Sequence, residues 1–191
     1  MWRKEAPSRW SELFGDLEGH AEALAGVEER EEVAERTRIE TGRLALTDRL
    51  RPATGQILDV RCLGAGQLRG RLDRVGADWL LLAESSGCTA LLPLTSVLAV
   101  AGLGRVSAAA GGEIDHRLGL RSALRGLARD RATVRVVLVD GGALTGTVDR
   151  VGSDFVELAE HPAGEPRRAG SVRRVWTLPM TGIAVVRRSA V

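Results

Sequence analysis

After about residue 55, apolar and polar residues alternate along most of the chain, which is the pattern of β-strands that bury one face. In "ILDVRCL", Leu58, Val60 and Cys62 fall on one side and charged residues fall on the other. This period of two is typical of a half-buried strand. Short turn sequences such as "GAG" and "VDGG" separate the alternating runs. The pattern therefore predicts several short antiparallel strands joined by tight turns.

The strand pattern occurs twice. "RVGADWLLLAE" at 74–84 returns as "RVGSDFVELAE" at 150–160, and eleven of the nineteen residues in 66–84 are identical 76 positions later. The strands that end each copy, "LPLTSVLAV" and "LPMTGIAVV", lie 86 positions apart, so the second copy holds ten extra residues, placed at 161–170. Each copy is predicted to form a short helix followed by about five strands.

The first 42 residues carry a helical pattern instead. Leu13, Leu17 and Leu24 recur at helical spacing, and Glu32 precedes Arg36 by four positions, a stabilising arrangement on a helix. The segment is either one interrupted helix or two helices that break near Gly26. Its apolar stripe is narrow, which favours contact with the rest of the chain or self-association.

A unit of five short strands buries one face only if its edges are closed or paired, and a small bent barrel achieves this. We therefore predict a mainly β protein with helices, in which an acidic helical segment precedes two tandem five-stranded small barrels. Each barrel is preceded by a short helix. The predicted boundaries are 1–42 for the acidic segment, 43–103 for the first barrel, 104–116 for a linker and 117–191 for the second barrel.

A helix followed by "VRVVLVDGGALTGTVDRVGSDFVEL" resembles the first motif of Sm-like proteins, and "LPMTGIAVV" resembles the last strands of Sm-like or SH3-like barrels. The whole chain, with its "WSELFGDLE" phrase, also resembles a family of uncharacterised actinobacterial proteins. In some Sm-like rings, the helix before the first strand lies on an RNA-binding surface. The uridine pocket is not implied, because this chain has Gly76, Gly152, Leu80 and Val156 where RNA-binding Sm proteins place Asp and Asn.

Charge is distributed unevenly along the chain. Residues 1–50 hold 8 basic and 12 acidic side chains, whereas residues 104–191 hold 14 basic and 9 acidic ones. The acidic N-terminal part and the basic C-terminal part of the chain indicate a basic surface in the second copy. Aromatic residues make up only 3% of the chain and Tyr is missing, which disfavours a platform for stacked bases.

Two groups of arginines are candidate nucleic-acid contacts. One group is spaced by four residues along a predicted helix, with leucines on the opposite face, and consists of Arg117, Arg121, Arg125 and Arg129. The other flanks the 161–170 insertion and consists of Arg167, Arg168, Arg173 and Arg174. A solvated helix face and a solvated loop are the alternatives for these groups.

The repeated phrase predicts a structural turn rather than a reactive site. Gly76 and Gly152 supply a bend, and Asp78 and Asp154 are expected to accept hydrogen bonds from turn N–H groups. The three histidines are scattered, and the two cysteines fit neither a metal site nor a disulfide framework. We therefore expect no enzyme activity, metal or cofactor, no small-molecule substrate, no membrane insertion and a cytoplasmic location.

The sequence thus predicts a non-catalytic binding module. The first hypothesis is binding of nucleic acid, RNA in particular, by the basic surface of the second barrel. The second hypothesis is a protein-interaction or assembly module, in which the acidic N-terminal helix self-associates or docks a partner. The scarcity of aromatic residues favours the second hypothesis, and the basic balance of residues 104–191 favours the first.

Overall fold

The computed structural model describes residues 42, 44–84, 87–104, 106, 118–162 and 172–189. The chain divides into two compact units, 1–44 and 45–191. The predicted acidic helical segment and most of the predicted linker and insertion lie outside the described residues. The fold is therefore that of residues 45–191.

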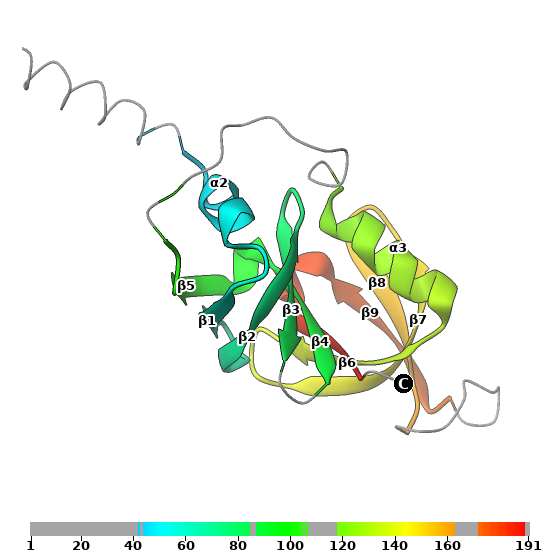
Figure 1. Ribbon diagram of the computed structural model, residues 1–191. Helices are drawn as coiled ribbons and strands as arrows, with labels where there is room; N and C mark the ends of the chain where they lie inside the picture. Colours follow the sequence, from blue (N-terminus) through cyan, green and yellow to red (C-terminus); the bar gives the residue numbers. More distant parts are fainter. Residues whose placement is uncertain are drawn as a thin grey trace, which may run out of the picture. The chain divides into compact units, whose positions relative to one another are not determined.

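The described part of this unit holds ten strands and two α-helices, and Figure 1 shows their arrangement. The first copy of the repeat forms α2 (Leu46–Leu50), β1 (Ile57–Cys62), β2 (Gly66–Val75), β3 (Trp79–Glu84), β4 (Cys88–Pro93) and β5 (Val97–Ala101). The second copy forms α3 (Leu120–Asp130), β6 (Thr133–Leu138), β7 (Ala143–Val151), β8 (Phe155–Glu160), β9 (Arg174–Pro179) and β10 (Ile183–Ser189). Single turns of 3₁₀ helix occur at η1 (Arg51–Ala53), η2 (Leu94–Ser96) and η4 (Met180–Gly182).

All ten strands belong to one antiparallel sheet, in the order β5-β1-β2-β3-β4-β10-β6-β7-β8-β9. The prediction of two separate five-stranded barrels is therefore wrong. Both copies order their strands in the same way, but the sheet runs without interruption from one copy into the other. Its outer edges are β5 at one end and β9 at the other.

Strand β10 is the reason that two separate barrels do not form. Its first part pairs with β6, so that Ile183 lies opposite Leu138, and its later part pairs with β4, so that Val186 lies opposite Leu91. Hydrogen bonds on both sides of β10 satisfy the backbone groups of two neighbouring edges at once. The copies are thus joined by the same kind of ladder that holds each copy together.

The hydrophobic core also crosses the boundary between the copies. The cluster under the first copy includes Val137, Ala184 and Val185, which belong to the second copy. The cluster under the second copy includes Trp79 and Leu91 from the first. Each of the two clusters is therefore built from residues of both copies, and neither copy buries its apolar face alone.

The repeated phrase has nearly the same local geometry in both copies. The pairing register shifts between Leu72 and Arg74 in β2, and it shifts at the equivalent position in β7. Such a bulge bends the strand and increases its twist. A Cβ at Gly76 would collide with the ring of Trp79, and a Cβ at Gly152 would collide with the ring of Phe155. Glycine is needed there because an aromatic ring packs directly on the backbone.

No helix in the described part of the chain is long and apolar enough to cross a membrane.

Candidate functional site

Helix α3 carries the candidate site, and its three faces have different surroundings. Leu120 and Leu124 form the inner face and are buried in the core cluster that includes Trp79. Their spacing of four places both leucines on one side of a helix, and the helix packs against β7. One flank of α3 borders an apolar groove, and the opposite flank carries arginines.

The start of α3 is held by the other copy of the repeat. Gly119 precedes the helix and has no side chain that could cap it. Instead, Asp78 accepts a hydrogen bond through Oδ1 from the backbone N–H of Leu120 at 2.6 Å. The indole N–H of Trp79 donates to the carbonyl oxygen of Leu118 at 2.8 Å. A carboxylate at this end of a helix satisfies a free N–H and matches the helix dipole.

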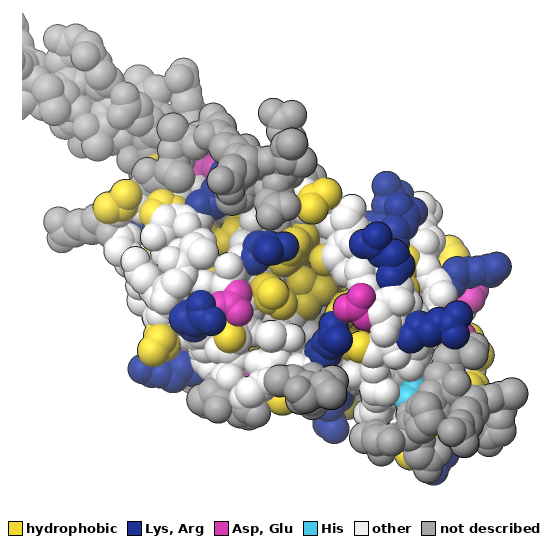
Figure 2. Space-filling view, turned by 45° about the vertical axis from the view of Figure 1, so that its right-hand side comes forward, with side chains coloured by type: hydrophobic (Ala, Val, Ile, Leu, Met, Phe, Trp, Pro, Cys, Tyr) yellow, Lys and Arg dark blue, Asp and Glu magenta, His cyan; other side chains and the backbone are white. Residues whose placement is uncertain are grey.

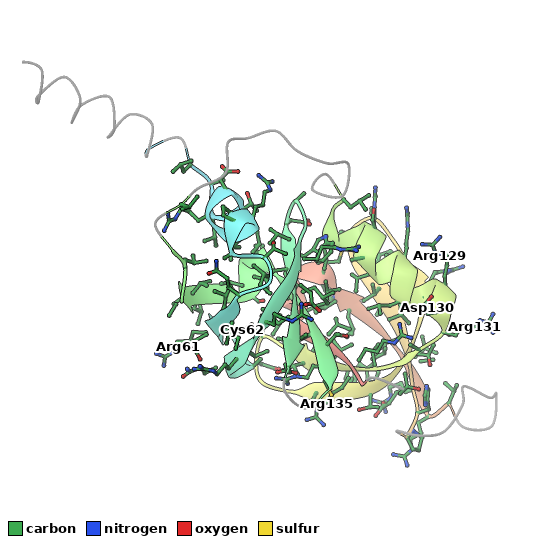
Figure 3. All side chains as sticks on the ribbon, viewed as in Figure 1. Arg61, Cys62, Arg129, Asp130, Arg131 and Arg135 are labelled. Atoms are coloured by element: carbon green, nitrogen blue, oxygen red, sulfur yellow. The ribbon has the colours of Figure 1, made fainter. Side chains whose placement is uncertain are left out.

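The basic flank of α3 consists of Arg121, Arg125 and Arg129, which are all exposed. Residues four apart rise by about 6 Å along a helix, so the three guanidinium groups can form one row. Arg131 follows directly after the helix with a φ of 48°, and it is the only residue other than glycine with positive φ in the described part of the chain. Figure 3 shows Arg129 and Arg131 projecting from this end of α3. We call these four arginines the α3 basic face.

The α3 basic face differs from most other arginines in its pairing. Among described residues, its four side chains make no ion pair and no hydrogen bond. Elsewhere, six arginines form ion pairs with acidic side chains, namely Arg51, Arg69, Arg71, Arg150, Arg187 and Arg188. Unpaired cations gathered on one exposed surface create a local positive potential that attracts anions.

A shallow hollow of about 670 Å³ lies between α3 and β7. Arg125, Arg129 and Arg131 line it together with Asp149 and small side chains. A neighbouring hollow shares Arg131 and Asp149 and extends to Arg150 and Glu157, which form an ion pair with each other. The two hollows together form a trough in which basic side chains outnumber acidic ones.

The other flank of α3 borders a groove of about 350 Å³. Its walls come from both copies, with Trp79, Leu81 and Leu91 on one side and Ala123 and Leu127 of α3 on the other. Figure 2 shows apolar side chains gathered in a hollow with basic side chains around it. The groove is apolar at its floor and carries Arg74 and Arg188 among its lining residues.

Comparison of the chain with models of protein families, with curated proteins and with solved structures finds no significant match.

The predicted arginine sites fall into two separate places. Arg121, Arg125 and Arg129 lie on α3, whereas Arg173 and Arg174 lie at the start of β9, where both are exposed. The guanidinium of Arg174 lies 5.0 Å from the centre of the Trp176 ring, a distance that permits a cation–π contact. Arg117, Arg167 and Arg168 lie outside the described residues.

The predicted structural turns take different partners in the two copies. The Asp78 side chain bonds to the start of α3, 42 residues away in sequence, rather than to its own turn. The Asp154 side chain accepts a hydrogen bond from the neighbouring Ser153 hydroxyl at 3.2 Å. The backbone carbonyl oxygens act alike, because those of Asp78 and Asp154 accept bonds from the first residues of η2 and η4.

His161 and Cys62, two described residues of potentially reactive types, both lie in buried structural environments. His161 is buried and lies 2.8 Å from the Thr147 hydroxyl, with its other ring nitrogen 3.0 Å from the carbonyl oxygen of Pro162. Cys62 is also buried, and this burial raises the pKa of its thiol, although a hydrogen bond with Ser96 acts in the opposite direction. A thiol with a raised pKa is a poor nucleophile. Among described residues, no cluster of three or more metal-binding side chains occurs.

Two features of the site were not predicted from the sequence. Arg131 breaks the spacing of four and follows the helix in a left-handed conformation, which is rare for a residue other than glycine. The groove combines residues from β3, β4, β10 and α3, and no sequence pattern shows that these elements meet. The "RDR" triplet after Ala128 is the one local signal that could have indicated a basic end to the helix.

Proposed function

We propose that this chain is a non-catalytic nucleic-acid-binding module that holds the phosphate backbone of RNA along the α3 basic face. The observation that carries the proposal is the contrast in pairing, because the four arginines of this face have no acidic partner among described residues. Arginine donates several hydrogen bonds in a planar fork that matches phosphate geometry. Three of the four arginines, Arg125, Arg129 and Arg131, line the trough beside α3.

Recognition would be directed at the backbone rather than at the bases. The two aromatic residues of the repeated phrase pack on the backbone of their own loops, and Trp79 is only 5% exposed. Among the described residues, no aromatic side chain lines the trough. Binding should therefore be tolerant of sequence and strongly dependent on salt, because phosphate contacts release counterions.

The test is fluorescence anisotropy of a labelled single-stranded RNA of mixed sequence, measured at 50 and 200 mM salt. Four phosphate contacts, one for each arginine of the α3 basic face, should lower the affinity roughly 50-fold between these concentrations. The variant Arg121→Gln/Arg125→Gln/Arg129→Gln should bind about 10-fold or more weakly at low salt and show a shallower salt dependence. A matched variant that removes the same charge from the first copy, Arg61→Gln/Arg69→Gln/Arg71→Gln, should change binding by less than about 3-fold.

No binding at 50 mM salt contradicts the proposal. Equal losses in the two triple variants also contradict it, because they indicate attraction to net charge rather than to one face. The same measurement with single-stranded DNA decides between the two nucleic acids, since tighter binding of DNA overturns the choice of RNA. The second sequence-based hypothesis, assembly through the acidic N-terminal segment, concerns residues outside the described part and stays a prediction.

A further inference from the structure

The junction between the two copies is an asymmetric strand pair. Strand β10, the last of the second copy, pairs with β4, the fourth strand of the first copy. Val186 lies opposite Leu91, and Arg187 lies opposite Ala90. The surface that β10 offers differs from the surface that β4 offers, so the junction is a head-to-tail contact rather than a symmetric one.

The repeat supplies an equivalent for each side of this junction. "LPLTSVLAV" and "LPMTGIAVV" align 86 positions apart, so β5 is the counterpart of β10, and β9 is the counterpart of β4. These two counterparts are the edge strands of the sheet. Within the described part of the chain, no strand pairs with the outer edge of either one.

Both edge strands expose apolar side chains. Strand β5 consists only of apolar residues, and Leu98 is 60% exposed, whereas its counterpart Ala184 in β10 is fully buried. On β9, Val175 is 52% exposed. Soluble proteins usually protect an edge strand with a charge, a proline or a bulge. Strand β5 contains neither a charged residue nor a proline. Its pairing with β1 skips Leu98, which is a bulge on β5, but the counterpart β10 has the same bulge at Ala184 and still pairs with β4.

We propose that β5 of one molecule pairs with the outer edge of β9 of a second copy of this chain, and so repeats the internal junction between molecules. The transferred register places Val100 opposite Thr177 and Ala101 opposite Trp176 of the second copy. The partner is a second copy because the molecule already contains this contact once, between equivalent strands.

A second part of the junction has a free counterpart as well. In the first copy, Asp78 reaches across to the start of α3 in the second copy. Its equivalent Asp154 is exposed, and its side chain accepts a hydrogen bond from the adjacent Ser153 hydroxyl. In the first copy, β4 and Asp78 hold the second copy. The second copy presents their equivalents, β9 and Asp154, to a second molecule.

The contact between molecules is weaker than the internal junction. Arg187 forms a two-point ion pair with Glu84 across the junction, at 3.0 and 3.1 Å, and its counterpart in β5 is Ala101. Gly102, with a φ of 95°, ends the extended conformation directly after Ala101. The shared ladder is therefore short, and we expect association that depends on protein concentration. A head-to-tail contact leaves a free edge at each end, so growth continues until the assembly closes on itself.

Sedimentation velocity of the full chain between about 1 and 200 μM tests the proposal, since weak edge-to-edge contacts fall in this range of affinity. The wild type should change from monomer to larger species as its concentration rises. Leu98→Lys blocks the β5 edge, and Val175→Lys blocks the β9 edge, so each variant alone should remain monomeric. Both side chains are exposed, and circular dichroism should confirm that both variants keep the fold.

Mixing the two blocked variants gives the decisive result. Leu98→Lys retains a free β9 edge and Val175→Lys retains a free β5 edge, so an equimolar mixture should form dimers and nothing larger. The matched control is Ile57→Lys, because Ile57 is also 60% exposed but lies on β1, inside the sheet. This control should associate like the wild type.

Cross-linking tests the register separately. In a Cys88→Ser background, chains with Val100→Cys and chains with Thr177→Cys should form a disulfide-linked dimer when mixed, since opposite residues of antiparallel strands lie within disulfide range. Neither variant should cross-link with itself. A wild type that stays monomeric at every concentration overturns the proposal. Oligomers of Val175→Lys alone, or no dimer in the mixture of lysine variants, also overturn it.

Discussion

The two copies of the repeated phrase share a backbone structure but differ in the hydrogen-bond partners of their loops. Both copies place a bulge before the loop and an aromatic ring over a glycine. The first copy uses Trp79 and Asp78 to bind the start of α3. The second copy has Phe155, which has no N–H to donate, and its Asp154 bonds locally. The loop of the first copy therefore joins the two copies, whereas among the described residues the loop of the second copy makes only local side-chain bonds.

This difference shows that a repeat can keep its fold while its loops acquire separate partners. In the first copy, the loop holds a helix that comes from the second copy. That contact fixes the start of α3. It therefore also positions the α3 basic face, because Leu124 of this helix is buried in the core while Arg125 is exposed to solvent. The binding surface proposed for the second copy therefore depends on the first.

The largest expected effect comes from the buried face of α3. Leu124 is fully buried in the cluster that spans the copies, so Leu124→Ala should lower the free energy of unfolding by about 2–5 kcal/mol. Leu127 is only half-buried beside the groove, and Leu127→Ala should lower it by roughly half as much or less. Chemical denaturation followed by tryptophan fluorescence measures both values. Equal losses would show that α3 is not anchored through Leu124.

The glycines under the aromatic rings should give the next largest effect. Gly76→Ala forces a methyl group into the ring of the buried Trp79, and we expect a loss of about 1–3 kcal/mol from overpacking. Gly152→Ala should lose less, because Phe155 is half-buried and has no hydrogen bond that holds its ring. Thermal and urea unfolding of the two variants provide the comparison. A larger loss at Gly152 would reverse the proposed difference between the loops.

The aspartates separate the two loops more directly. Asp78→Ala removes the acceptor for the Leu120 N–H, and losing such a helix cap should lower stability by about 1 kcal/mol. Asp154→Ala removes a contact with Ser153 that is exposed, and we expect a change of less than about 0.5 kcal/mol. Hydrogen exchange of the first turn of α3 should speed up in the first variant only. Faster exchange in both variants would contradict this assignment.

An effect similar in size to that of Asp78→Ala is expected from making the first loop resemble the second. Trp79→Phe keeps an aromatic ring over Gly76 but removes the donor to the Leu118 carbonyl oxygen. One hydrogen bond of this kind contributes roughly 0.5–1.5 kcal/mol, less than the larger overpacking effects. The measurement is urea unfolding followed by circular dichroism, because the substitution removes one tryptophan. The reverse change, Phe155→Trp, should not raise the free energy of unfolding. Among the described residues, no helix like α3 lies at that loop to accept a hydrogen bond from the indole N–H.

Local features of the fold followed from the sequence, and long-range ones did not. Alternation located the strands around Leu58 and Val60, and the spacing of Leu120 and Leu124 located the inner face of α3. The partner of β10 was not predictable, because its apolar residues suit burial on either side of the junction. The prediction of two barrels assumed that each copy pairs its own edges, and hydrogen bonding satisfies those edges equally well across copies.

The candidate site was predictable to a similar extent. Arg121, Arg125 and Arg129 share a helical face because of their spacing alone. Whether an arginine has an acidic partner depends on residues far away in sequence, as the pairing of Arg188 with Asp130 shows. Arg131 and the groove were missed for the same reason, since both depend on where α3 meets other elements.

The position of β10 also determines how the molecule reaches its native state. The ion pair between Arg187 and Glu84 joins residues that are 103 positions apart in the chain, and the strand pair beside it closes a loop of similar size. Closing such a loop is entropically unfavourable, and proteins rich in distant contacts fold slowly. Until β10 is in place, β4 and β6 are both unpaired edges. Folding is therefore expected to have a late, slow step in which the last strand enters the centre of the sheet and completes both halves together.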